Sequence, residues 1–291
     1  MKKADKKFQL ADRLLIFMTI LPIIIGIVIK VLTTPAEEGI AVHGALIYFT
    51  LPAPVQNLPI TESQVNSWLV MTAIAFLCLY LTHGIRRGVE TKRQYFCEWI
   101  VEMCYGMVKG NMGEFFKEFA PFIASILALS AFSSLICLFG LYSPTSDINV
   151  VAGWAILVFG LITYYKMKCG PKQYLKSFGE PVKFLAPLNI ISEVATPISM
   201  SFRHYGNVLS GSVISVLVAS GLQGVSAKLF SGINFPFLQI GIPAVLSIYF
   251  DVFSGCLQAY IFAMLTMLYV SGGFPAEEYF RRKAEKSKKV N

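Results

Sequence analysis

Residues 14–33 read LLIFMTILPIIIGIVIKVLT, an apolar run in which Lys30 is the single charged side chain. A helix needs ~20 such residues to cross the ~30 Å of hydrocarbon in a bilayer. Lysines precede the run, as they do in a secretory signal peptide, but the run is long for a signal and no small-residue cleavage site follows it. We therefore predict a helix that stays in the membrane as an anchor.

The rest of the chain shares this apolar character. Hydrophobic residues make up 55% of the 291 residues and charged residues only 14%, which is too apolar for a soluble domain of this size. Five further stretches are long enough to span a bilayer, namely 66–84, 119–141, 150–167, 188–222 and 237–271. The sequence thus predicts an all-α integral membrane protein with about six spanning helices.

Basic residues predict the orientation through the positive-inside rule. All but three of the 25 Lys and Arg residues lie on one side of a path that crosses the membrane six times. The exceptions are Lys30 and Lys228 near the outer face, and Arg203 inside an apolar helix. We expect both termini in the cytoplasm of a bacterial cell, with the chain in its plasma membrane. Topology accounts for the net charge of +8, so nucleic-acid binding is not predicted.

The chain offers no pattern for a bound cofactor. Its six cysteines are scattered and form no C-x-x-C pair, which is typical of small apolar fillers and reduced thiols. A glycine-rich phosphate loop is also missing from the sequence. We predict no metal site, no disulfide framework and no ATP binding by this chain.

Four parts follow one another along the chain: an N-terminal anchor with an outer loop (1–65), three spans (66–185), a pair of long spans (186–272) and a basic cytoplasmic tail (273–291). The apolar patch of the outer loop, around Tyr48, is compatible with a position on the membrane surface.

Segment 86–118 lies between the second and third spans. It repeats aromatic side chains, such as Tyr95 and Trp99, at helical spacing beside acids. The repeat predicts an amphipathic helix, either resting at the inner membrane interface or packed on other spans.

The last two apolar segments are longer than a bilayer is thick. At about 35 residues each, they would measure ~52 Å as helices, against ~30 Å of hydrocarbon. Tilting or kinking removes this mismatch, and Pro197 and Pro243 are places where bends could form. We expect a strongly tilted helix pair, joined on the outer side through 221–236.

Arg203 is the most unusual residue of the fifth span. An arginine inside the membrane costs a few kcal/mol, because its guanidinium stays charged. Asn207 and Ser210 follow at helical spacing and predict a polar stripe with it. The arginine is therefore a functional candidate, although a structural arginine paired within the bundle gives the same sequence pattern.

Two acids and an amide are the other candidates in the last spans. Asp251 and Gln258 are seven residues apart in the sixth span, and this spacing predicts that they share a helical face. Asp251 could load and unload an ion from the outer side, or serve only as counter-ion to Arg203, while Gln258 would help to hold the arginine. Glu193, near the inner start of the fifth span, could line an inner water path or cap the helix.

These candidates lie within a recognisable pattern. Ser199–Asn207 reads SMSFRHYGN, preceded by PLNIISE at 187–193 and followed by LQAYIF at 257–262. The pattern resembles subunit a of the F-type ATP synthase, and the resemblance extends over residues 66–272. In that family the arginine matched by Arg203 faces a carboxylate of the rotating c-subunit ring. The glutamine matched by Gln258 lies beside the arginine, and Asn207 matches a family asparagine.

The resemblance implies an ion-translocating stator subunit rather than an enzyme. Two half-channels would load and unload the carboxylates of the c-ring, with Arg203 between them. The implied partners are the c-ring, the b-subunit peripheral stalk, the rest of the F1Fo complex and the lipid bilayer. No cofactor is implied beyond the transported H⁺ or Na⁺.

The sequence departs from the family pattern at three positions. The usual Arg-Leu-Phe-Gly-Asn is Arg-His-Tyr-Gly-Asn here, so that His204 follows the arginine. Nine residues after the arginine, where a glutamate or histidine is frequent, the chain has Ser212. Seven residues before the glutamine it has Asp251, so that one carboxylate would do the work of a pair.

Two other functional classes were weighed against this interpretation. A self-contained ion transporter also places charges on broken helices at mid-membrane, but it predicts two related halves, and the sequence contains no convincing inverted repeat. An intramembrane hydrolase needs a nucleophile with a base, or metal ligands. The histidines, His43, His83 and His204, are too dispersed for that.

Overall fold

The computed structural model describes residues 2–33, 44–52, 54, 57–85, 91–168, 174, 178, 184, 186–229, 238–273 and 279. Its main helices are α1 (Lys2–Thr33), α2 (Glu62–Thr82), α3 (Lys92–Met112), α4 (Ala120–Leu135), α5 (Ile148–Lys168), α7 (Ala186–Leu229), α8 (Leu238–Ser247) and α9 (Gly255–Gly272). Short 3₁₀ helices cover Glu114–Phe119, Ile136–Phe139 and Pro144–Ser146, and a π-helix covers Ile248–Ser254.

Six helical segments of the described chain are long and apolar enough to cross a membrane. They are Leu10–Thr33, Glu62–Thr82, Glu114–Phe139, Ile148–Lys168, Ala186–Ser226 and Gly241–Gly272. Each overlaps one of the predicted stretches, so the prediction of an all-α integral membrane protein is confirmed. Most of the predicted basic tail, 274–278 and 280–291, lies outside the described residues.

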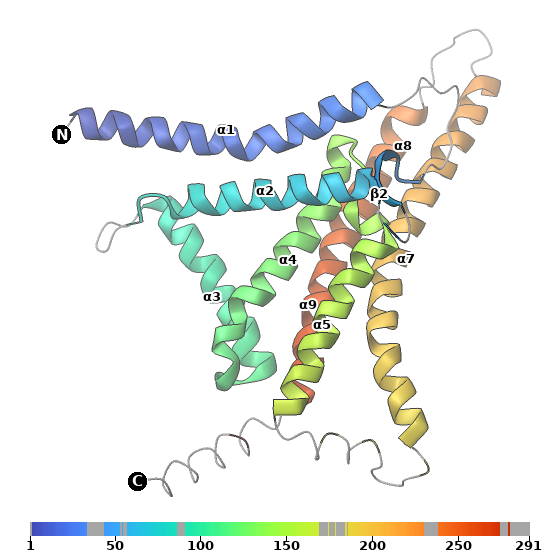
Figure 1. Cartoon of the computed structure of the whole chain (residues 1–291). Helices are drawn as coiled ribbons and strands as arrows, with labels where there is room; N and C mark the ends of the chain where they lie inside the picture. The colour runs from blue at the N-terminus through green and yellow to red at the C-terminus, as the bar shows by residue number, and fades with distance from the viewer. Residues whose placement is uncertain are drawn as a thin grey trace, which may run out of the picture.

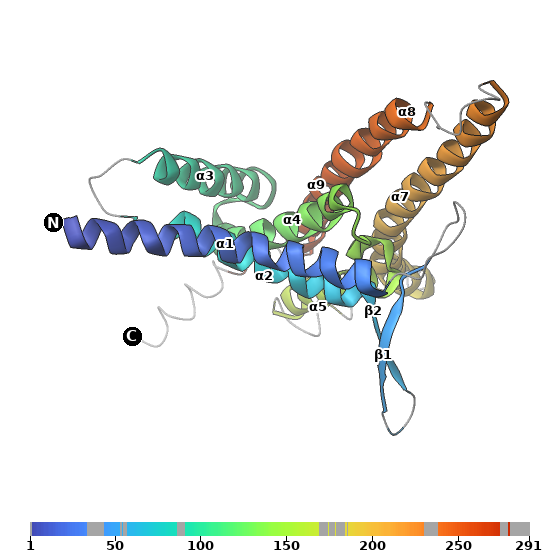
Figure 2. The same cartoon turned by 90° about the horizontal axis from the view of Figure 1, so that it is seen from above.

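The helices form two sets that run in different directions. Helices α1 and α2 lie side by side and cross the direction of α4, α5, α7 and α9 (Figures 1 and 2). Gly26 allows the close approach of α1, because a Cβ at this position would lie 2.9 Å from a Leu69 methyl of α2.

Polar contacts hold α1 near both of its ends. At one end the Asp12 carboxylate accepts a hydrogen bond from Arg93 Nη1 at 3.0 Å and lies 2.9 Å from His83 Nδ1. At the other end Lys30 Nζ donates to the Gly140 carbonyl at 2.6 Å and lies 3.7 Å from the buried Glu62 carboxylate. Helix α1 is therefore attached both to α2 and α3 and to the corner between α4 and α5.

The outer loop contains a β-hairpin that the sequence analysis did not predict. Strands β1 (Ile47–Leu51) and β2 (Leu58–Thr61) pair antiparallel, and the hairpin projects from the helices (Figure 2). The aromatic and β-branched residues of 47–51 favour a strand. Their apolar character was instead attributed to a surface position. Residues 34–43 of the loop lie outside the described chain.

Helix α3 confirms the helix predicted within 86–118. Its C-terminal half buries Val108 and Met112 against α4 and α9. This half therefore packs on other helices, which was one of the two interpretations. Its N-terminal half leaves Tyr95 and Trp99 exposed, at 73% and 53% of their surface. The packing interpretation thus holds for the C-terminal half, and a position at the membrane interface stays a prediction for the N-terminal half.

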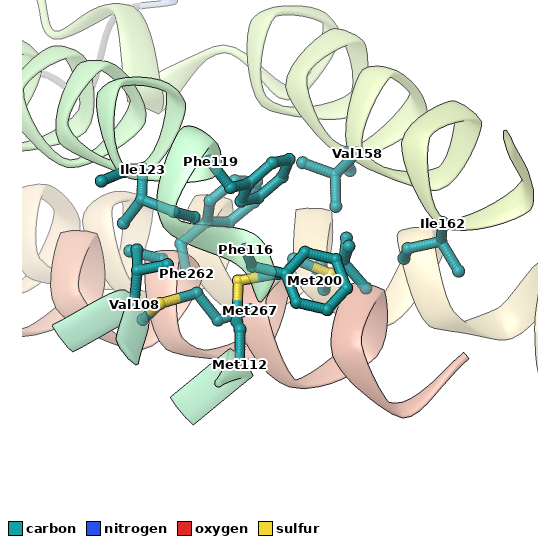
Figure 3. Packing of buried hydrophobic residues seen from close by; sticks show 14 residues of the cluster. Val108, Met112, Phe116, Phe119, Ile123, Val158, Ile162, Met200, Phe262 and Met267 are labelled. Carbon is teal, nitrogen blue, oxygen red and sulfur yellow. The ribbon is translucent and has the colours of Figure 1, made fainter. Parts of the chain in front are cut away.

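The main apolar core lies where α3, α4, α5, α7 and α9 meet (Figure 3). Phe116 and Phe119 enter it from the 3₁₀ helix before α4, and Phe262 and Met267 enter from α9. Phe119 and Tyr165 pack edge to face, with ring centroids 6.1 Å apart. This core holds the middle of α7 against the bundle through the buried Met200.

The last two spans are long, as predicted. Helix α7 has 44 residues, which corresponds to about 66 Å at the α-helical rise. The following span is divided into α8, the π-helix and α9. Its interruption is the π-helix at Ile248–Ser254 and not Pro243, which lies within α8.

Helices α4 and α9 are in close contact at a glycine. A Cβ added to Gly255 would lie 2.5 Å from Ser134 Cβ, whereas one added to Gly272 in the same helix would meet no atom within 4 Å. We expect Gly255→Ala to destabilise the protein by about 1–3 kcal/mol, because the two helices must move apart. The measurement is the thermal unfolding of the purified protein, with Gly272→Ala as matched control. Equal unfolding temperatures for the two variants would contradict this account of the contact.

Candidate functional site

Arg203 lies on the face of α7 that the rest of the described chain leaves exposed. No hydrogen bond or ion pair of its guanidinium is found within the part of the chain that the structure describes. A charged group in this position inside a spanning helix calls for a partner. Since this partner is not found among the described residues, the structural alternative of an arginine paired within the bundle loses its support.

One turn after Arg203, a hydrogen bond joins the two long spans. Asn207 Nδ2 donates to Gln258 Oε1 at 2.7 Å, and Gln258 is 2% exposed. The glutamine was expected to help hold Arg203, but its described partner is Asn207. The bond links α9 to α7 at a position one helical turn from Arg203.

The serines of α7 are turned back onto their own helix. Ser210 Oγ donates to the Asn207 carbonyl at 3.1 Å, and Ser212 Oγ donates to the Leu209 carbonyl at 2.8 Å. Ser210 is exposed, as Arg203 and Asn207 are, so the predicted polar stripe is present. Ser212 is exposed as well, on the opposite side of the helix.

Asp251 lies in the π-helix and is half-buried. A π-helix adds a residue to its turn, so residues before it are rotated relative to α9. The seven-residue spacing therefore does not place Asp251 directly above Gln258, as an uninterrupted α-helix would. No ion pair links Asp251 to Arg203 among the described residues, which speaks against a role as its private counter-ion.

Gly211 brings the π-helix close to α7. A Cβ at Gly211 would lie 3.0 Å from the Phe250 side chain, whereas Gly206 has no neighbour of this kind within 4 Å. Of the two glycines in this part of α7, Gly211 is therefore the one that permits a close approach of a neighbouring helix.

Glu193 lines a polar cavity of about 200 Å³ between α5, α7 and α9. Its carboxylate accepts hydrogen bonds from Lys166 Nζ at 2.7 Å and from the Tyr174 hydroxyl at 3.1 Å. Burial raises the pKa of the Tyr174 hydroxyl above its usual value, and the hydrogen bond to Glu193 adds to this effect. Asn189, Ser192 and Thr196 add polar groups to the lining.

Lys166 and Tyr174 were not predicted from the sequence as partners of Glu193. Lys166 was counted only as a basic residue of the inner side, and it lies 27 residues before the glutamate on another helix. No local spacing links the two, so only the packing of α5 on α7 brings them together.

His204 follows the arginine but points into the bundle, where it is 0% exposed. Its ring packs edge to face against Trp154 and Phe262, with centroid distances of 6.2 and 5.8 Å. Nε2 lies 3.4 Å from Ser130 Oγ, and Nδ1 has no hydrogen-bond partner. Adjacent residues thus face opposite environments, with Arg203 turned outward and His204 turned inward.

A comparison with protein families identifies the family of this chain. The profile of the family described as ATP synthase A chain matches residues 64–271, which include α2 to α9. The chain belongs to the ATP synthase A chain family. The match begins after the hairpin and leaves α1 outside it.

Bacterial proteins named ATP synthase subunit a are similar to this member of the family. One from Legionella pneumophila is 28% identical, over 83% of this chain and 96% of its own length. One from Bacillus pumilus is 32% identical, over 74% of this chain and 93% of its own length. One from Listeria welshimeri is 34% identical, over 70% of this chain and 86% of its own length. The similarity therefore covers nearly the whole length of these relatives.

The Asn207 to Gln258 contact gives a prediction for this family member. We expect Asn207→Ala and Gln258→Ala each to reduce ATP-driven ion pumping in membrane vesicles, because each leaves the other amide without its partner. The double variant should pump no worse than the poorer single variant, since both remove one interaction. Losses that simply add would show that the two amides act independently.

Proposed function

We propose that this chain is the ion-translocating stator subunit in the membrane sector of a rotary ATP synthase. The observation that carries the proposal is the outward-facing Arg203, which lacks a counter-ion among the described residues and is backed by the Asn207 to Gln258 contact. Such a face suits a partner that brings its own carboxylates. The proposed partner is the ring of c subunits, with the b-subunit stalk and the rest of the F1Fo complex beyond it.

The charge of Arg203 explains how an ion would be released. A ring carboxylate that faces lipid must be protonated or bound to a cation, because a bare charge there is costly. At ~4 Å from a guanidinium and an effective dielectric constant of ~20, the attraction is ~4 kcal/mol. This energy favours the empty, ionised carboxylate by a factor of about 1,000.

Separate access on the two sides of Arg203 would turn this exchange into transport. We assign the outer access to Asp251 and Ser212, and the inner access to the cavity at Glu193. The ion would enter from one side, ride on the ring for nearly a full turn, and leave on the other side. The open polar cavity of about 200 Å³ supports the inner assignment.

The arrangement of the helices supports a strong tilt of α7 and α9 in the membrane. Helices α1 and α2 cross the direction of the others (Figure 1), so the two sets cannot both stand along the membrane normal. A helix of about 66 Å fits a ~30 Å slab only when steeply tilted. With α1 and α2 upright, α7 would lie along the ring and offer it a long contact.

The basic residues support an orientation with both termini in the cytoplasm and the hairpin outside. Lys166, on the inner side by the positive-inside rule, pairs with Glu193 in the cavity. The cavity therefore opens on the cytoplasmic side in this orientation.

Arg203→Ala tests the proposal. We expect the variant to lose ion-coupled ATP synthesis while the complex still assembles, because the charge is needed and its packing is not. Arg203→Lys keeps the charge without the planar fork, so a partial loss is expected. The measurement is ATP synthesis by vesicles under an imposed ion gradient, and normal synthesis by Arg203→Ala would refute the proposed function.

Asp251 should act as the relay of the outer access. We expect Asp251→Asn to slow ion transport strongly and to leave assembly intact, because the amide cannot exchange an ion. Asp251→Glu and Asp251→His should retain part of the transport. Ion flux through the membrane sector measures this, and a native flux in Asp251→Asn would leave the outer access to Ser212 and ordered water.

A further inference from the structure

His204 is a buried polar group that the proposed mechanism does not use. It is fully enclosed by α4, α5 and α9, and its aromatic neighbours Trp154 and Phe262 carry no charge. Among the described residues, the hydrogen-bond contact found for the ring is with Ser130. An apolar side chain of similar size would fill this space without any cost of desolvation.

The imidazole does incur such a cost. A buried nitrogen without a hydrogen-bond partner destabilises a protein, and Nδ1 of His204 is in this position. Packing alone therefore does not account for a histidine here. Its two nitrogens differ in surroundings, since Nε2 faces a hydroxyl and Nδ1 is buried without a hydrogen-bond partner.

Buried hydroxyls continue from His204 along α4. Ser130, Ser133 and Ser134 recur at helical spacing on one buried face of α4. Ser134 satisfies its hydroxyl on the Ser130 carbonyl, but Ser133 Oγ has no partner. Close packing on Gly255 explains the small size of Ser134. It does not explain why the Ser133 hydroxyl and His204 Nδ1 are buried without hydrogen-bond partners.

The same row of hydroxyls leads toward the outer end of α4. Ser143, in the corner between α4 and α5, donates to the Ser133 carbonyl at 2.7 Å and lies 2.7 Å from the Thr145 hydroxyl. Ser143 and Thr145 are both buried. Polar groups thus line the interior from this corner down to the level of Arg203.

We propose that His204 is a proton-relay residue, which passes protons from the hydroxyl row of α4 toward the ring carboxylate at Arg203. This inference rests on the proposed function and assigns a further residue to its outer access. Imidazole suits the task, because one nitrogen can take up a proton while the other gives one up.

The transfer balances in protons and charge. The Ser130 hydroxyl gives its proton to the unprotonated Nε2 of a neutral His204 and takes a replacement proton from a water on its outer side, and that water takes up a proton from the outer solution. The proton on Nδ1 leaves through further waters to the ionised ring carboxylate on the Arg203 face, and the carboxylate becomes neutral. His204 ends neutral in its other tautomer, and a ring flip resets it.

This chemistry also selects the ion. An imidazole and a row of hydroxyls can pass a proton by exchanging bonds, but they cannot pass Na⁺ in this way. The ring that meets this chain should therefore carry protons.

The test uses the whole complex in membrane vesicles. We expect His204→Leu and His204→Gln both to slow passive proton conduction through the membrane sector by about 10- to 100-fold. Leucine preserves the packing and glutamine preserves one polar contact, but neither can relay. Assembly and ATP hydrolysis should be retained, as measured by co-purification of the ring and by phosphate release.

Ser130→Ala is the second variant and changes the packing very little. It should also slow conduction, and Ser130→Ala combined with His204→Leu should be no slower than His204→Leu alone, because the two groups act in series. Ser125→Ala on the exposed side of α4 is the matched control and should conduct as the native complex does.

Native conduction in His204→Leu or in Ser130→Ala would overturn the relay. Transport of radioactive sodium by the native complex would overturn it too, while leaving the proposed function intact. The proposed function has a separate test. Normal ion-coupled ATP synthesis by Arg203→Ala would refute the proposed function, and with it the relay.

Discussion

A permanent positive charge inside an apolar helix is the constraint on which the rest of this structure depends. The guanidinium of Arg203 cannot lose its proton, and hydrocarbon gives it no hydration. The chain does not neutralise it with an acid of its own among the described residues. Instead it turns the arginine outward and places Asn207 and Gln258 one turn away. Under the proposed function, the counter-charge of this exposed face comes from another protein.

Close packing between helices provides this rigidity. Gly255 lets α9 approach α4, and Gly211 lets the π-helix approach α7. Without a hydrophobic driving force in lipid, such contacts between small residues are a main source of helix association. The aromatic core at Phe119 and Phe262 then fixes the rotation of α7 about its axis, so that Arg203 faces outward while His204 faces inward.

The apolar runs were sufficient to predict the spans, because the thickness of a bilayer sets their length. The helix at 92–112 could be predicted as well, since aromatic residues recur in it at helical spacing. The hairpin was missed because its apolar residues, around Tyr48, suited a membrane surface equally well.

Of the site, the stripe of Arg203, Asn207 and Ser210 follows from helical geometry alone. The partner of Gln258, the pairing of Lys166 with Glu193 and the π-helix at Asp251 depend on contacts between distant segments. No spacing in the sequence encodes such contacts. The roles of the site residues stay predictions.

The attachment of α1 at both ends has a mechanical meaning under the proposed function. A rotor that turns against α7 exerts an equal and opposite torque on the stator. Elastic deformation of the stator would dissipate part of the energy of each rotation step. Asp12 ties α1 to Arg93 near one face of the membrane, and Lys30 ties it to Gly140 and Glu62 near the other. A helix bound to its neighbours at two points this far apart resists twisting of the helices relative to one another. The segment outside the family match would thus contribute to transmission of load rather than to the path of the ion.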